Sequence, residues 1–154
     1  TKYNELIKSS EMVGKASLYL KAINTIDGSD VRVSKRANVP YNRLRGFEKG
    51  KVGPVDGSDY IGGNYISTLN LSTNLPGILS TIEILDFNYF IDIGNVWGVD
   101  YNSSLDKSKI RSSTGIGLNV LTPVGPLSFS LAQPITKASS DKTETFRFNL
   151  GTTF

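Results

Sequence analysis

Apolar and polar residues alternate with a period of two along most of the chain, a pattern typical of β-strands whose two faces meet different surroundings. Six stretches with this pattern predict strands: residues 15–23, 64–72, 85–97, 110–121, 127–133 and 146–154. The connections differ in length, because Thr122–Pro126 is a short turn with Pro and Gly, whereas Asp30–Gly63 and Gly98–Lys109 are long. The sequence therefore predicts an all-β antiparallel meander.

The alternation fits two architectures. In a soluble β-sandwich the apolar face packs against a second sheet and the polar face meets water. In a transmembrane β-barrel the apolar face meets lipid and the polar face lines a wet lumen. The polar faces here carry Gly, Ser, Asn and charged residues, and aromatic residues such as Tyr65, Trp97 and Phe154 fall near strand ends, as at a membrane interface. Several stretches also reach the ~9–11 residues that cross a bilayer. These features favour the barrel.

The composition excludes several kinds of chemistry. The chain has no His and no Cys, which excludes Cys nucleophiles, His-based triads, disulfides and imidazole or thiolate zinc sites. No carboxylates are paired for catalysis, so we expect no catalytic residue, no metal site and no cofactor. The net charge is +3 with both signs interspersed, which argues against nucleic acid as a partner. The tetrapeptide DGSD at 27–30 and 56–59 indicates turns, because it lacks the spacing of a calcium loop.

Six strands are too few to close a membrane barrel, since the smallest have about eight. An unclosed sheet would leave unpaired backbone groups in hydrocarbon, at a large cost in free energy. The chain begins with Thr1 rather than Met, and its start lacks the apolar segment of a signal peptide. We expect either that further strands precede Thr1 in the natural protein or that several copies assemble, and we favour the first.

Five segments carry a resemblance to a known family when they are taken together and in order. They are RLRGFEKGKVGP, IGGN, FIDIGNVW, IRSSTGIGLNVLTPVGPLSFSLAQPI and FRFNLGTTF. The chain from Met12 to Phe154 resembles the carboxy-terminal half of the barrel in the BamA family of outer-membrane insertases, and more loosely the bacterial surface-antigen superfamily around it. The resemblance implies that residues 1–154 form about the last six strands of a transmembrane barrel that has 16 strands in that family.

The resemblance also implies a function and a set of partners. Members of the family assemble and insert other β-barrel proteins in the bacterial outer membrane, without a nucleotide, metal or covalent step. The expected partners are unfolded outer-membrane protein clients, accessory assembly lipoproteins and the lipid bilayer. Two alternatives stay open: a barrel of the same superfamily that exports one partner polypeptide, as in two-partner secretion, and a soluble β-sandwich that serves as a binding module.

The segment RLRGF lies in the longest connection and matches the signature loop of the family. By resemblance, residues 30–63 fold into the lumen, where Arg45 reaches the inner wall with its planar, bidentate guanidinium. Phe90 and Asp92 match the wall residues that receive it, and the alternation by itself puts both on the polar phase of their strand. Gly46 would permit a tight turn beside the arginine, and Phe47 would pack against the wall.

The neighbouring strand departs from the family at Asn70, where the insertases typically offer a Glu to the same arginine. Asn can still accept a hydrogen bond, but it lacks the charge that makes such bonds strong. We therefore expect the loop to depend mainly on Asp92. Asp56 or Asp59 in the loop could compensate.

The last stretch matches the terminal strand that the assembly machinery of such barrels reads as a targeting signal. By resemblance Phe146, Phe148, Leu150 and Phe154 face lipid, with Phe154 at the membrane interface. Gly151 matches a glycine that kinks this strand inward, beside a seam that pairs weakly with the first strand of the barrel. We expect Gly151 to loosen that seam.

Overall fold

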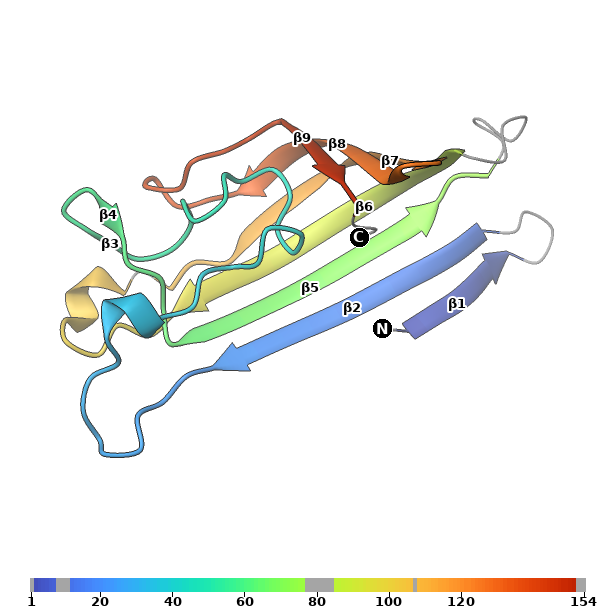
Figure 1. Cartoon of the computed structure of the whole chain (residues 1–154). Coiled ribbons are helices and arrows are strands. Elements are labelled where there is room, and N and C mark those ends of the chain that lie inside the picture. Colours follow the sequence, from blue (N-terminus) through green and yellow to red (C-terminus); the bar gives the residue numbers. More distant parts are fainter. Residues whose placement is uncertain (1, 8–11, 77–84, 107, 152–154) are drawn as a thin grey trace.

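The computed structural model describes residues 2–7, 12–76, 85–106 and 108–151. Seven strands form one antiparallel sheet in the order β1-β2-β5-β6-β7-β8-β9, so each strand pairs with the next along the sheet (Figure 1). Their bounds are β1 Lys2–Ile7, β2 Met12–Ala22, β5 Tyr65–Asn74, β6 Leu85–Trp97, β7 Arg111–Thr122, β8 Gly125–Thr136 and β9 Phe146–Leu150. A small hairpin of β3 (Val55–Asp56) and β4 (Asp59–Tyr60) lies within the connection from β2 to β5.

The predicted all-β antiparallel meander is confirmed, and the six predicted strands correspond to β2 and β5 to β9. The prediction missed β1, which pairs with β2. Its sequence, KYNELI, mixes apolar and polar residues on both phases, so it gives no clean alternation. The last strand is shorter than predicted, because β9 ends at Leu150. Phe154 lies outside the described residues.

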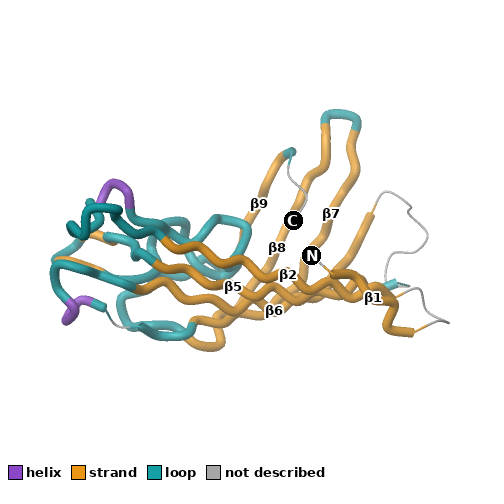
Figure 2. The backbone as a smooth tube through the Cα atoms, turned by 90° about the horizontal axis from the view of Figure 1, so that it is seen from below, coloured by secondary structure: helices purple, strands orange, loops and turns teal. Residues whose placement is uncertain are grey.

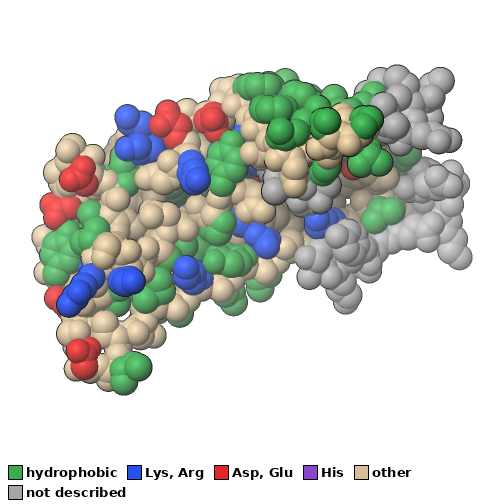
Figure 3. Space-filling model, in the orientation of Figure 1, with side chains coloured by type: hydrophobic (Ala, Val, Ile, Leu, Met, Phe, Trp, Pro, Cys, Tyr) green, Lys and Arg blue, Asp and Glu red, His purple; other side chains and the backbone are tan. Residues whose placement is uncertain are grey.

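The two faces of the sheet invert the arrangement of a soluble protein. Large apolar side chains on the outer face are exposed, among them Leu18, Leu20, Leu131 and Phe146. Polar side chains on the inner face are fully buried, among them Thr68, Asp92, Ser113 and Ser128. The sandwich alternative requires a second sheet that covers the apolar face. The part of the chain that the structure describes contains no such sheet. Figure 3 shows apolar side chains gathered over the strands near β8 and β9, and charged side chains spread toward the loops.

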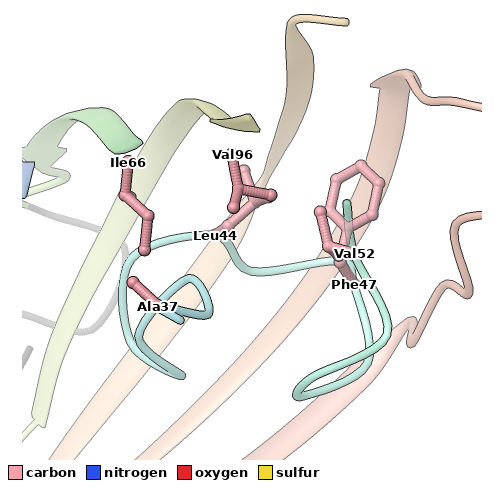
Figure 4. Close-up of a cluster of buried hydrophobic side chains, with 6 residues drawn as sticks. All are labelled: Ala37, Leu44, Phe47, Val52, Ile66 and Val96. Atoms are coloured by element: carbon pink, nitrogen blue, oxygen red, sulfur yellow. The ribbon is translucent and has the colours of Figure 1, made fainter. Parts of the chain in front are cut away.

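The connection between β2 and β5, called the inner loop below (residues 23–64), lies over the inner face and supplies the core. In Figure 1 it crosses in front of β5 and β6, and Figure 2 shows it gathered with the other long connections at one end of the strands. Reciprocal hydrogen bonds between the backbones of Ala37 and Gly63, both 2.9 Å, fold the loop back on itself. Six buried apolar side chains then pack between loop and sheet (Figure 4): Ala37, Leu44, Phe47, Val52, Ile66 and Val96.

Both DGSD tetrapeptides form turns. In the first, Asp27 accepts hydrogen bonds from the amide (3.2 Å) and the hydroxyl (2.7 Å) of Ser29, and these bonds lower the pKa of the Asp27 carboxyl. The second makes the β3–β4 hairpin, with Gly57 at φ +63°. The described residues hold no group of three or more Asp or Glu side chains that could bind a metal ion. None of their helical segments is long and apolar enough to cross a membrane.

Candidate functional site: the inner loop and the sheet wall

Arg45 of the inner loop forms a bidentate ion pair with Asp92 of β6. Its Nε and Nη2 donate to the two carboxylate oxygens over 2.7 and 2.8 Å, and its backbone amide donates to Oδ2 over 3.0 Å. The guanidinium carbon lies 3.4 Å from the centre of the Phe90 ring, so the cation also stacks on an aromatic face. The two charged side chains are 6% and 0% exposed. Because breaking such a buried pair leaves an uncompensated charge, the pair is a strong attachment for the loop.

The register of the sheet brings the partners of this pair into one row on the inner face. Asn70 of β5 lies opposite Asp92, and Asp92 lies opposite Ser113 of β7. The Asn70 Nδ2 donates to Asp92 Oδ1 and to the carbonyl of Arg43, both over 2.8 Å. The Ser113 hydroxyl donates to the carbonyl of Arg45. Three neighbouring strands therefore contact the loop at Arg43 and Arg45.

Asn70 uses both ends of its amide group at this site. Its amide nitrogen holds the Asp92 carboxylate, and its oxygen accepts a long hydrogen bond of 3.4 Å from Arg43. The row thus contains one carboxylate, which is the one that the sequence predicted to dominate. The two acidic residues suggested as substitutes, Asp56 and Asp59, belong to the β3–β4 hairpin. Asp56 accepts a hydrogen bond from the Tyr101 hydroxyl over 2.6 Å, which raises the pKa of Tyr101.

Gly46 and Phe47 follow the arginine and press against the wall. Gly46 has φ +89°, a conformation that side-chain-bearing residues rarely adopt. A Cβ added there would lie 3.2 Å from the Ser113 Cβ and 3.3 Å from the Ala132 Cβ, so the backbone approaches β7 and β8 closely. Phe47 is buried in the core and forms a β-bridge with Thr143.

The terminal strand β9 presents Phe146, Phe148 and Leu150 on its exposed face. The Phe148 and Phe129 rings pack with centroids 5.2 Å apart. Gly151 has φ +83°, so the extended conformation ends there, although its amide still donates to the Pro126 carbonyl over 2.8 Å. An added Cβ at Gly151 would meet no atom within 4 Å. The roles of these residues at a seam stay predictions.

Two further buried arginines of the described residues form ion pairs beside the inner loop, and the sequence predicted neither. Arg111 at the start of β7 pairs with Asp141 of the β8–β9 connection over 2.9 Å. Arg147 of β9 pairs with Glu144 over 2.9 Å and donates to two carbonyls of the inner loop. One signal was present: both arginines lie on the polar phase of strands whose other polar-phase residues are small or uncharged.

A protein-family comparison decides the kinship of the chain. The model of the Omp85 superfamily domain matches residues 2–154. The chain belongs to the Omp85 superfamily. Within this superfamily it is similar to the outer membrane protein assembly factor BamA of Neorickettsia risticii, with 29% identity over 142 residues, 90% of this chain and 19% of that protein. The BamA of Neisseria meningitidis serogroup B is 32% identical over 142 residues, covering 72% of this chain and 17% of that protein.

A solved structure supports the same kinship for this Omp85 chain. The crystal structure of BamA from Haemophilus ducreyi lacking POTRA domains 1-3 matches 95% of this chain and 32% of that one, with a TM-score of 0.82 and 28% identity. The predicted resemblance to a BamA barrel is thus confirmed, and with it the outer membrane as the location. The chain spans about a fifth of the length of the curated relatives it matches.

Proposed function

We propose that this chain forms the carboxy-terminal part of the barrel of an outer-membrane insertase, which assembles and inserts β-barrel proteins. The observation that carries the proposal is the similarity, over 90% of the chain, to a protein named as an outer membrane protein assembly factor. The exposed apolar outer face and the buried polar inner face support it, because this is the sidedness of a lipid-embedded barrel. The fragment would comprise residues 1–154, with residues 30–63 folded into the lumen.

The mechanism that we propose is mechanical and electrostatic. Arg45 and Asp92 hold the inner loop against the wall, with Phe90 under the guanidinium and Asn70 beside the carboxylate. Clients would pair by their backbone edge with the terminal strand, next to a seam that Gly151 weakens. Their own folding would supply the free energy. Accessory lipoproteins and the bilayer would be the remaining partners.

The test uses the full-length parent protein in phospholipid vesicles with an unfolded outer-membrane barrel protein as client. We expect the parent protein to accelerate client folding, read as the gel mobility shift of the folded barrel. Arg45→Ala should lower this rate, because the loop loses a bidentate, charge-assisted attachment. Vesicles without the parent protein give the spontaneous rate.

Three results would contradict the proposed function or its mechanism. Client folding at the spontaneous rate would exclude insertase activity. Passage of a single polypeptide into the vesicle interior, without insertion, would instead identify the exporter of the same superfamily. Normal client assembly and normal barrel stability in Arg45→Ala would show that the ion pair does not hold a functional loop.

A further inference from the structure

Arg147 is the charged residue on the inner face of β9, and its side chain is turned into the inner loop. It is 3% exposed. Its Nε donates to the Glu144 carboxylate over 2.9 Å, its Nη1 to the Tyr41 carbonyl and its Nη2 to the Phe47 carbonyl. The guanidinium carbon lies 3.9 Å from the centre of the Tyr41 ring. One side chain of the terminal strand therefore binds both ends of the loop segment that contains Arg45.

The chain that leads into β9 is bound to the same loop by its backbone. The Glu144 amide donates to the Gly46 carbonyl (3.0 Å), the Glu48 amide to the Lys142 carbonyl (3.0 Å), and the Lys142 amide to the Lys51 carbonyl (3.1 Å). These bonds form an irregular antiparallel pairing around the Phe47–Thr143 bridge. The inner loop thus pairs with residues 142–144, immediately before the chain begins to pair with β8.

The terminal strand has few other attachments in the described part of the chain. Its ladder with β8 joins five residue pairs, from Leu131–Phe146 to Leu127–Leu150. The ladder between β7 and β8, by contrast, runs the length of both strands, from Ser112 to Thr122. Phe146, Phe148 and Leu150 point outward and contribute nothing to the inner face. The buried, hydrogen-bonded Arg147 therefore supplements a short ladder, the packing of the Phe129 ring and one hydrogen bond from Gly151 in holding β9.

We propose that Arg147 is a positioning residue that couples the inner loop to the terminal strand, so that β9 stays aligned with β8 only while the loop is docked on Asp92. The carbonyls of Tyr41 and Phe47 reach one guanidinium only when the segment between them is folded around Arg45, as it is here. Release of Arg45 would separate these two acceptors and so loosen β9. This inference rests on the proposed function, because β9 is the strand that would border the seam.

The test is hydrogen–deuterium exchange, followed by mass spectrometry, on the full-length parent protein in phospholipid vesicles without any client. We expect Arg147→Ala to speed the exchange of the β9 amides by about tenfold or more, the size expected for losing hydrogen bonds to a charged group. The β7–β8 turn should exchange at its native rate. Arg45→Ala should speed β9 exchange in the native background and add little in the Arg147→Ala background.

Several controls make the result decisive. Arg32→Ala removes an exposed arginine of the same loop and should leave β9 exchange unchanged. Arg147→Lys keeps the charge but cannot reach three acceptors at once, so it should loosen β9. It provides the test if the alanine variant fails to fold. Native β9 exchange in the lysine variant would overturn the proposal. So would an equal effect of Arg45→Ala in both Arg147 backgrounds.

The same experiment separates this inference from the proposed function. Exchange is measured without a client, so it does not depend on assembly activity. A parent protein that assembles no client but shows the coupled exchange would contradict the insertase and support the coupling. A parent protein that assembles clients but shows independent exchange at β9 and the loop would overturn the coupling alone.

Discussion

At the scale of single residues, Gly46 has to satisfy a backbone and a packing requirement together. We predict that Gly46→Ala destabilises the parent barrel by about 2–5 kcal/mol, the sum of a left-handed backbone penalty and an overpacked wall. The packing part arises because the new Cβ would lie 3.2 Å from the Ser113 Cβ and 3.3 Å from the Ala132 Cβ. Urea unfolding of the parent barrel in vesicles would measure the loss.

Gly50 of the same loop provides a matched control. It also has a positive φ, +70°, but an added Cβ there would meet no atom within 4 Å. Gly50→Ala should therefore cost only the backbone penalty, about 1–2 kcal/mol. Equal losses for the two variants would mean that the loop does not press against the wall at Gly46.

The sequence alone predicted part of this residue-level picture. Strand alternation assigned Phe90 and Asp92 to the polar phase, and the structure buries both on the inner face. The Arg45–Asp92 pairing came from the family resemblance, because nothing local links positions 47 residues apart. The contacts of Arg147 with Tyr41 and Phe47 span 106 and 100 residues, and no sequence motif predicted them. Alternation gives the side of a strand on which a residue lies, but not the loop that will cover it.

At the scale of elements, one buried carboxylate binds the first part of the β8–β9 connection, ahead of the residues that pair with the inner loop. Asp141 accepts from Arg111 Nε (2.9 Å) and Nη2 (3.1 Å), from the Gly53 amide (3.3 Å) and from the Ala138 amide (2.6 Å). It therefore joins β7, the inner loop and its own connection. Residues 138–141 depend on these bonds to a side chain, because the backbone pairing with the inner loop begins only at residue 142.

We predict that Asp141→Asn opens this connection to protease. Lys137 and Lys142 are exposed there, so trypsin cleavage reports how often the segment unfolds locally. Loss of the charged acceptor should speed cleavage in vesicles about tenfold or more. Asp59→Asn, which changes an exposed carboxylate of the β3–β4 hairpin, should leave the rate unchanged. Cleavage of the Asp141 variant at the native rate would show that the carboxylate does not fix the segment.

Strand prediction succeeded where one face of the sheet is apolar and the other polar, as in β6 and β7. It failed for β1, whose sequence mixes apolar and polar residues on both phases, and it extended β9 past Gly151, where a positive φ ends the strand. The β3–β4 hairpin is two residues long on each side, too short for any period to appear. The elements that escaped prediction are thus those in which the period-two alternation is mixed, interrupted or too short to recognise.

At the scale of the whole molecule, the sheet has its apolar side chains outside and its charged pairs inside. In water the exposed leucines and phenylalanines of the outer face would be an unfavourable surface of unusual extent. In a bilayer the same face is the favourable one, while the buried Arg45–Asp92, Arg111–Asp141 and Arg147–Glu144 pairs keep their charges away from lipid. Contact of the outer face with lipid would therefore explain why a folded sheet exposes so many apolar side chains.

This sidedness leads to a prediction at Leu131, which lies in the middle of β8, points outward and is 49% exposed. Leu131→Arg should make folding into phospholipid vesicles less favourable by about 2–4 kcal/mol, because a cation near the bilayer midplane is poorly solvated. Ile26→Arg is the matched control, since Ile26 is fully exposed and belongs to the inner loop rather than to a strand. Urea titration of folding into vesicles would compare the two variants of the parent protein. If both cost the same, the outer face does not contact lipid, and a water-facing sheet would have to explain why so many apolar side chains lie on it.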